Sequence, residues 1–151
     1  MKRPALQPSL KGRALRLLSQ REHSRLELER KLAPHETEPG SLARALDELQ
    51  AKGFISEERA IESVIHRRAA KLGSARVRQE LAAKGLSGEA VAAAMAGLEA
   101  TETARAREVW RKKFGQPPQD PQERARQIRF LVSRGFAAEA VRRVVQGAGE
   151  D

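Results

Sequence analysis

Aliphatic residues recur along this chain at intervals of 49 or 50 residues. Three sets carry the pattern: Leu32/Leu81/Leu131, Leu42/Val91/Val141 and Leu46/Met95/Val145. A repeat of this length holds about three short helices, which cannot bury an apolar face alone and gain stability by stacking on neighbouring repeats. The chain is therefore expected to form three stacked helical units that present an elongated, curved binding surface.

Helix caps and apolar spacing predict nine helices. We expect them at residues 10–21, 24–33, 41–52, 57–71, 75–84, 88–99, 102–114, 121–134 and 138–146. Ser24 opens a capping-box pattern, and Asp120 precedes a proline that suits the first position of a helix. Ser56, Ser74 and Ser87 also stand where N-caps are expected. No segment shows the sustained alternation of a β-strand, so the sequence predicts an all-α fold.

The predicted architecture is three tandem three-helix repeats of the right-handed helical bundle type, forming an elongated, curved array. We expect a flexible segment at 1–9, repeats at 10–55, 56–100 and 101–146, and a flexible tail at 147–151. The first helices of the three repeats align poorly with one another. The repeat is therefore clear only over the second and third helices of each unit.

Three tripeptides look like copies of one element: Lys52-Gly53-Phe54, Lys84-Gly85-Leu86 and Arg134-Gly135-Phe136. Only the last two share a register in the repeat. All three are expected to end a helix, with glycine in the left-handed conformation and the apolar residue folded back on the helix end. They predict helix termination rather than a ligand site. In the first repeat, Pro34–Gly40 stands at the turn that corresponds to the last two tripeptides, and we expect a stiff, exposed loop there.

The chain is strongly basic, with 29 Lys and Arg against 20 Asp and Glu and a formal net charge of +9. Basic residues are in excess in 1–33, 64–84, 105–113 and 114–146, whereas 34–63 and 85–104 have an excess of acidic residues. The basic blocks thus recur on the first two helices of each unit. Such a charge favours an anionic partner, most often nucleic acid, although an acidic protein surface or a membrane surface would favour the same sign.

Stacking of equivalent helices would align several arginines along one ridge. They are Arg25, Arg30, Arg76, Arg78, Arg124, Arg126 and Arg129. The alternative is that these are ordinary solvated helix faces, supported by pairs such as Glu27 with Lys31. The ridge as a set favours a contact with an extended anion.

Two stretches are denser in cations than a solvated face requires, namely 66–71 and 111–113. Trp110 and Phe114 flank the second stretch, and a cation beside an aromatic ring suits stacking on unpaired bases. However, these two aromatic residues are four positions apart on one predicted helix. That spacing favours core positions for both.

Several kinds of chemistry have no support in the sequence. The chain has no cysteine, no phosphate-binding glycine loop and three isolated histidines, so we expect no enzymatic activity, no metal site and no cofactor. No apolar run approaches the roughly 20 residues that span a bilayer, and Met1 is not followed by a signal-peptide core. A cytoplasmic location without membrane attachment is therefore expected.

Five successive regions of the chain carry recognisable motifs: 14–24 (ALRLLSQREHS), 46–55 (LDELQAKGFI) continuing to Glu58-Arg59 and His66-Arg67-Arg68, 76–85 (RVRQELAAKG), 112–115 (KKFG), and 124–127 (RARQ) with 130–136. In these regions the sequence resembles the RecX family of RecA regulators. The resemblance covers almost all of 10–146. It implies three tandem three-helix repeats that bind in the groove of the RecA–single-stranded-DNA filament and inhibit its ATPase, strand-exchange and co-protease functions. At Glu36-Thr37 the chain departs from the glycine and apolar pair typical of the family.

Together, the resemblance and the charge predict a monomeric inhibitor whose partners are the RecA filament and single-stranded DNA, with double-stranded DNA as a further candidate. The basic side chains would meet phosphates or acidic RecA surface and block filament extension. The expected contacts are Arg21, Arg25, Arg67, Arg68, Lys71, Arg76, Arg78, Lys112, Lys113, Arg124, Arg126 and Arg129. The alternatives are a sequence-specific helix-turn-helix DNA regulator and an RNA-binding helical scaffold.

Overall fold

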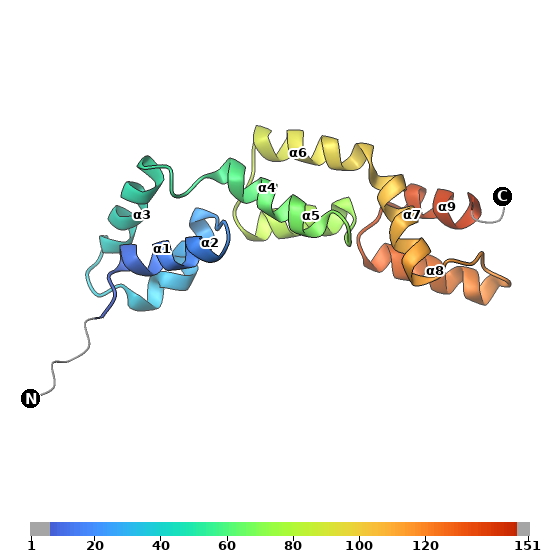
Figure 1. Ribbon diagram of the computed structural model, residues 1–151, viewed down its shortest axis with the longest axis horizontal. Helices are drawn as coiled ribbons and strands as arrows, with labels where there is room; N and C mark the ends of the chain where they lie inside the picture. Colours follow the sequence, from blue (N-terminus) through green and yellow to red (C-terminus); the bar gives the residue numbers. More distant parts are fainter. Residues whose placement is uncertain (1–6, 148–151) are drawn as a thin grey trace, which may run out of the picture. The chain divides into compact units, whose positions relative to one another are not determined.

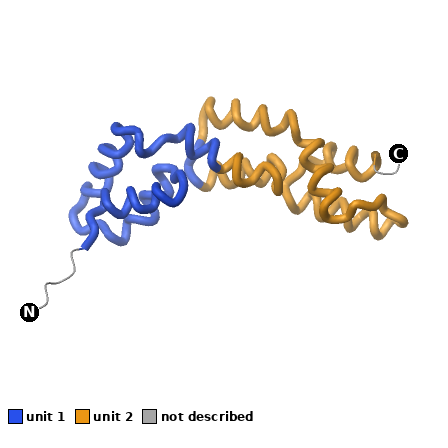
Figure 2. Tube along the Cα trace, in the orientation of Figure 1, with its two compact units in different colours: residues 1–63, 84–86 blue, residues 64–83, 87–151 orange. Residues whose placement is uncertain are grey.

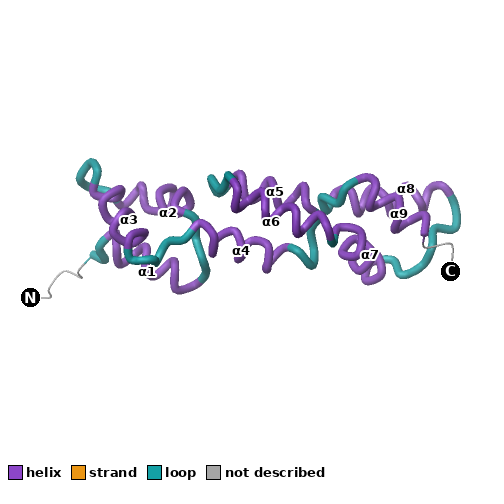
Figure 3. Tube along the Cα trace, turned by 90° about the horizontal axis from the view of Figure 1, so that it is seen from above, coloured by secondary structure: helices purple, strands orange, loops and turns teal. Residues whose placement is uncertain are grey.

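A computed structural model describes residues 7–147, which are helical and contain no strand (Figures 1 and 3). The elements are α1 (Leu10–Gln20), α2 (Arg25–Leu32), the 3-10 helix η1 (Ala33–His35), α3 (Ser41–Ala51), α4 (Glu57–Arg68), α5 (Ser74–Ala83), α6 (Glu89–Ala100), α7 (Glu102–Lys113), α8 (Pro121–Ser133) and α9 (Ala138–Gly147). The all-α prediction is confirmed, and each predicted helix is present. Of the segments predicted to be flexible, 1–6 and 148–151 lie outside the described residues.

The described residues divide into two compact units (Figure 2). Unit 1 comprises the chain up to residue 63 together with Lys84–Leu86. Unit 2 comprises 64–83 and the chain from residue 87 onward. Each unit is therefore built from more than one of the predicted repeats.

Unit 1 has an aliphatic core formed by α1, α2 and α3. Its buried members are Ala14, Leu28, Leu32, Leu42, Leu46, Leu49 and Ile55. Ser24 starts α2 with the predicted capping box, in which its hydroxyl accepts the Glu27 N–H and the Glu27 carboxylate accepts the Ser24 N–H. This cap fixes where α2 begins, and so it fixes which leucines of α2 face the core.

The predicted loop of the first repeat begins with η1 and continues, exposed, to Gly40. Glu36, at the position where the chain departs from the pattern of the family it resembles, caps the next helix. One of its carboxylate oxygens, Oε2, accepts a hydrogen bond of 2.8 Å from the backbone N–H of Leu42 in the first turn of α3. The glutamate at this position therefore satisfies an N–H group at the start of α3.

Unit 2 has a second core in which α9 packs on α7 and α8. Its buried members are Ala106, Trp110, Leu131, Phe136, Val141, Val144 and Val145. Trp110 is only 9% exposed and donates its indole N–H to Oε1 of the buried Gln127 at 2.8 Å. Phe114 is half-buried against the same cluster. The predicted core position is confirmed for Trp110, whereas Phe114 packs at the edge of this core.

The first helices of the repeats do correspond, but at a different interval. Ala14, Ala60 and Ala106 are all buried, and they are spaced by 46 residues instead of 49 or 50. The separation between this alanine and the matching leucine of the second helix (Leu32, Leu81 or Leu131) therefore lengthens along the chain, from 18 to 21 to 25 residues. This offset explains why the first helices align poorly in the sequence.

The three glycine tripeptides end their helices as predicted. Gly53, Gly85 and Gly135 have φ values of 83°, 72° and 91°. The expected apolar fold-back is wrong at Phe54, which is 48% exposed, whereas Leu86 and Phe136 are buried. The exposed position of Phe54 matches the sequence finding that this tripeptide does not share the register of the other two.

Of Ser56, Ser74 and Ser87, which are predicted to cap helices, Ser56 does so, because its hydroxyl accepts the N–H of Arg59 at 3.2 Å. The predictions for Ser74 and Ser87 are wrong. Ser87 does not cap α6, whose N-cap is Gly88 with a φ of 91° and no side-chain hydrogen bond. Ser74 is the first residue of α5, and its hydroxyl donates to the carboxylate of Glu102 instead of capping its own helix. A distant carboxylate therefore takes the hydroxyl that the local pattern assigned to the cap.

The last two tripeptides also hold successive repeats together. In unit 1, the Ser24 hydroxyl donates to the carbonyl of Lys84 at 2.7 Å, in what we call the α2 joint. In unit 2, the Gly73 N–H donates to the carbonyl of Arg134 at 2.8 Å, in what we call the α5 joint. Ser24 and Gly73 are 49 residues apart and Lys84 and Arg134 are 50 apart, so both joints use equivalent positions.

The start of α8, the second helix of the third repeat, makes no equivalent joint within the described residues. Helix α8 starts with an additional turn, in which Asp120 accepts the Glu123 N–H on its side chain at 2.7 Å and the Arg124 N–H on its carbonyl at 3.0 Å. The first N–H groups of α8 are therefore satisfied within the helix. Terminal repeats of helical arrays commonly differ from internal ones in this way.

Glu27 anchors the α2 joint. The sequence pairs it with Lys31, but in the structure its carboxylate faces Arg21 and Lys84. Its carboxylate, 11% exposed, accepts from Arg21 at 2.6 Å and lies 3.8 Å from Nζ of Lys84. Burial raises its pKa, but the hydrogen bonds from Arg21 and the Ser24 N–H, with the charge of Lys84, outweigh burial and lower the pKa to about 2. The ionised form is therefore strongly favoured in the folded chain.

Acidification is expected to destabilise unit 1 as the pH falls from about 5 to about 2. The stabilisation from ionised Glu27 is complete above its pKa of about 4.3 in the unfolded chain and is lost as the pH falls through its folded value. Because solvent screens part of these interactions, the loss should be on the order of 1–2 kcal/mol. Urea unfolding followed by circular dichroism between pH 2 and 7 should show a weaker pH dependence for Glu27→Gln than for the unmodified chain, and parallel curves would contradict this role.

Candidate nucleic-acid interface

Several of the predicted contact residues are already paired with carboxylates. The pairs are Arg21 with Glu27 (2.6 Å), Arg25 with Asp47 (2.7 Å), Arg68 with Glu80 (2.8 Å), Arg67 with Glu80 (3.9 Å), Arg78 with Glu99 (2.6 Å) and Arg126 with Glu123 (3.4 Å). An ion pair at a protein surface contributes little to stability. It nevertheless reduces the positive potential that a partner meets at that point.

The stretch 66–71, one of the two densest in cations, is partly neutralised in this way. Arg67 and Arg68 lie at the end of α4, and Glu80 of α5 accepts a hydrogen bond from Arg68 at 2.8 Å. The glutamate comes twelve residues after Arg68 and belongs to another helix. The density of cations in the sequence therefore overstates the charge that this part of α4 presents.

The other predicted contact residues are exposed, and no carboxylate in the described part of the chain lies within ion-pair distance of them. They are Lys71, Arg76, Lys112, Lys113, Arg124 and Arg129. Arg76 belongs to the α5 joint, where its guanidinium donates to the carbonyl of Ser133 at 2.9 Å. Lys71, Lys112 and Lys113, by contrast, come together at one groove.

This groove, which we call the α7/α8 groove, has a volume of about 380 Å³. It is lined by Ala70, Lys71, Val109, Lys112, Lys113, Phe130 and Arg134. Nζ of Lys113 lies 5.2 Å from the centre of the Phe130 ring, and Cζ of Arg134 lies 4.9 Å from it. The groove therefore combines an aromatic ring with four cations and has no acidic side chain in its described lining.

Phe130 and Arg134 were not among the predicted contact residues. Arg134 was assigned to a helix stop, and Trp110 and Phe114 were the aromatic residues considered beside the basic stretch. Arg134, the C-cap of α8, follows Phe130 by four residues, and Phe130 lies beside the buried Leu131. That spacing is a signal that could have placed both on the edge of the core stripe.

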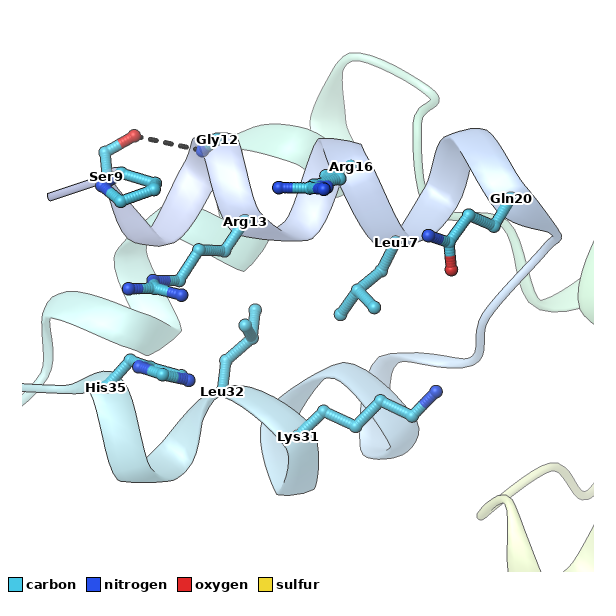
Figure 4. Close-up of a pocket in the computed structure, with 10 residues that line it drawn as sticks. Ser9, Gly12, Arg13, Arg16, Leu17, Gln20, Lys31, Leu32 and His35 are labelled. Carbon is cyan, nitrogen blue, oxygen red and sulfur yellow. Dashed lines mark hydrogen bonds between the residues drawn. The ribbon is translucent and has the colours of Figure 1, made fainter.

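A second groove lies between α1 and α2 in unit 1, with a volume of about 400 Å³ (Figure 4). Figure 4 shows Leu17 and Leu32 between the two helices, with Arg13 and His35 at one end. Arg16 and Lys31 also line this α1/α2 groove, and its described lining holds no carboxylate. Arg13, Arg16 and Lys31 are therefore further cations at a groove, and none of them is among the predicted contact residues.

A buried histidine positions one cation of this groove. Nζ of Lys31 lies 3.0 Å from Nε2 of His23, and Nδ1 of His23 lies 3.0 Å from the carbonyl of Arg21. Burial lowers the pKa of His23, the hydrogen bond to the Arg21 carbonyl opposes this, and the charges of Arg21 and Lys31 lower it further. His23 is thus neutral at physiological pH, so Nε2 accepts from Lys31.

The two grooves occupy corresponding places in the first and third repeats. Lys31 and Phe130 line them from the second helix of each repeat, and the residue between these two in the repeat register is Glu80. His35 and Arg134 correspond in the same way. The middle repeat therefore carries an acidic residue where the outer two carry a cation or an aromatic ring.

No helix within residues 7–147 is both long and apolar enough to cross a membrane. In the same residues, no three His, Cys, Asp or Glu side chains gather in a way that could hold a metal ion.

Comparison with known protein families assigns all three repeats. The models of the first, second and third three-helix domains of RecX match residues 11–49, 56–95 and 100–145. Regulatory protein RecX of Leptothrix cholodnii is 54% identical over 149 residues, covering 99% of this chain and 94% of its own. The chain belongs to the RecX family. The resemblance predicted from the sequence is confirmed.

Other RecX proteins agree with this assignment. Regulatory protein RecX of Ralstonia nicotianae is 50% identical over 140 residues, covering 93% of this chain and 88% of its own. The crystal structure of RecX from Lactobacillus salivarius superimposes with a TM-score of 0.77 at 16% identity, covering 94% of this chain and 96% of that one. A crystal structure of another regulatory protein RecX gives 0.72 at 18% identity, covering 91% and 71%. The three tandem three-helix domains are thus the RecX fold.

Proposed function

We propose that this RecX family member inhibits the RecA recombinase by binding the RecA–single-stranded-DNA filament. The observation that carries the proposal is the pair of cation-lined grooves in the first and third repeats, neither of which contains a carboxylate in its described lining. Corresponding basic grooves suit a partner that offers anionic groups repeatedly along its length, as a filament of protein and DNA does. The relatives named regulatory protein RecX support the regulatory role.

In this proposal, the groove cations hold DNA phosphates or acidic side chains of RecA, and the bound repeats hinder subunit movement and filament extension. The regulator then needs no chemistry of its own. Arg124 and Arg129 of α8 supply further exposed charge on unit 2. The predicted contacts that are already ion-paired contribute less, because each must first separate from its carboxylate.

The test is RecA ATP hydrolysis on single-stranded DNA, with the regulator added at substoichiometric amounts. The unmodified chain should suppress hydrolysis, and Lys71→Ala/Lys112→Ala/Lys113→Ala should need about tenfold more protein for the same effect. If about six phosphates are contacted, binding to single strands should also weaken with salt at a log–log slope near −4 to −5. Full inhibition by the triple variant would contradict the proposed site.

A matched variant removes the same charge from positions that are already neutralised. Arg78→Ala/Arg111→Ala/Arg143→Ala takes away three exposed arginines, each paired with a glutamate. It should inhibit RecA almost as well as the unmodified chain. An equal loss in both variants would show that net charge, and not the groove, determines inhibition. A footprint on one duplex sequence with no effect on RecA would favour the helix-turn-helix regulator instead.

A further inference from the structure

We propose that the α7/α8 groove binds single-stranded nucleic acid by stacking an unpaired base on Phe130. The backbone phosphates on either side of that base are then held by the surrounding cations, Lys71, Lys112, Lys113 and Arg134. The proposal rests on the proposed function in one respect, since it takes the DNA of the RecA filament as the source of the single strand.

Phe130 has the placement that a stacking platform needs. Its neighbour Leu131 is fully buried, whereas Phe130 is half-buried and reaches the groove. The Phe114 ring packs against it with the centroids 5.5 Å apart and the planes at 87°. This T-shaped contact restrains the orientation of the Phe130 ring.

The cations around Phe130 can follow a nucleic-acid backbone. Lys113 and Arg134 lie over the ring, each on a long, exposed side chain that can turn toward a phosphate. No carboxylate in the described residues is within ion-pair distance of Lys71, Lys112, Lys113 or Arg134. No ion pair within the described residues therefore has to break before a phosphate binds there. Cations flanking an aromatic platform are the usual arrangement for single strands.

The occupant is a single strand because the ring must meet the face of a base. In a duplex the base faces are covered by neighbouring pairs, so only an unstacked base can lie on Phe130. The α1/α2 groove provides an internal comparison, because Lys31 stands there at the position of Phe130. That groove can hold phosphates, and its described lining contains the imidazole of His35 but no Phe, Tyr or Trp ring.

The deciding experiment measures the Kd of the full chain, without RecA, for two labelled oligomers of equal length. One is oligo(dT), and the other is an abasic sugar-phosphate strand that keeps the phosphates and lacks the bases. The unmodified chain should bind oligo(dT) about tenfold more tightly. Phe130→Leu, which keeps an apolar packing group, should lose this preference while retaining its affinity for the abasic strand. Phe130→Trp should keep the preference.

A second readout reports stacking directly. In Phe130→Trp, oligo(dT) should quench the new indole fluorescence and the abasic strand should not. Trp110, the other tryptophan of that variant, is buried and hydrogen-bonded, and the unmodified chain measures its background. Circular dichroism checks that each variant is folded, and Lys112→Ala should weaken binding of both oligomers to a similar extent.

Unchanged preference for oligo(dT) in a folded Phe130→Leu variant would overturn the proposal, as would equal affinity of the unmodified chain for the two oligomers. The proposed function fails separately, in the RecA assay. Loss of base preference in Phe130→Leu supports the groove assignment whatever the effect on RecA. If inhibition by that variant is nevertheless complete, filament inhibition does not depend on the stacked base.

Discussion

Replacement of Glu102 by alanine is expected to destabilise unit 2 by about 3–5 kcal/mol, which is typical when one partner of a buried ion pair is removed. Glu102 is 6% exposed and lies 3.1 Å from the guanidinium of Arg105. It also accepts the backbone N–H of Ala137 at 3.0 Å and that of Ser74 at 3.2 Å, and it is bonded to the Ser74 hydroxyl. One carboxylate thus connects the starts of α5 and α7 to the segment before α9.

The loss is large because alanine leaves Arg105 in place without its carboxylate. The Arg105 guanidinium also donates to the carbonyls of Ala69, Leu72 and Leu98 at 2.8–2.9 Å, so it is held in position. Its charge would remain partly buried, and the N–H groups of Ser74 and Ala137 would lose their acceptor.

Urea unfolding followed by Trp110 fluorescence measures this loss, because the only tryptophan of the chain lies in unit 2. The control is Glu108→Ala on the same helix, where the glutamate is exposed and pairs with Arg111 at the surface. That variant should unfold at nearly the same urea concentration as the unmodified chain. Equal midpoints for the two variants would contradict the role of Glu102.

Replacement of Gly135 by alanine is expected to destabilise the α5 joint by at least about 3 kcal/mol. Its φ of 91° is unfavourable by about 1–2 kcal/mol for a residue with a side chain. A Cβ atom there would lie 2.7 Å from the backbone nitrogen of Arg76 and 2.3 Å from its Cγ. Because backbone atoms cannot simply rotate away, the turn would have to move off α5.

Movement of this turn would also break hydrogen bonds. The Gly73 N–H donates to the carbonyl of Arg134 at 2.8 Å, and the Ala75 N–H donates to the carbonyl of Gly135 at 3.1 Å. Each such bond contributes about 1 kcal/mol. Gly73 is itself part of the close approach, since a Cβ atom there would lie 2.3 Å from the Gly135 backbone.

Gly53→Ala is a matched control for strain alone. Gly53 has a similar φ of 83° in a similar basic-glycine-aromatic tripeptide, but a Cβ atom there would meet nothing within 4 Å. It should destabilise the chain by about 1–2 kcal/mol. Thermal unfolding followed by circular dichroism compares the two variants. A similar loss of stability in both would mean that the contact with Arg76 contributes nothing to the joint.

The sequence predicted the helices well because their signals are local. The Ser24 capping box, the proline after Asp120 and the glycines at 53, 85 and 135 each act within a few residues of the helix end they define. Burial of leucine and valine at intervals of three or four likewise needs no knowledge of the partner helix.

The candidate site was predicted less completely, because free charge depends on what faces each cation. Arg67 and Arg68 form a dense basic stretch, yet Glu80 of another helix neutralises much of it. Arg134 belongs to a tripeptide that predicts only a helix end, yet it lines a groove with three lysines and the Phe130 ring. Neither outcome follows from residue spacing along a single helix.

By itself, therefore, the sequence determined the all-α class, the repeat, the helix ends and the basic character of this RecX family member, since these depend on neighbours along the chain and on composition. The tertiary structure alone decided which cations stay free, which aromatic ring reaches a groove and which glycines hold repeats together. These depend on contacts such as that of Glu102 with Ala137, 35 residues apart, and of Arg76 with Ser133, 57 residues apart. Only the packing of helices brings such residues within hydrogen-bond distance.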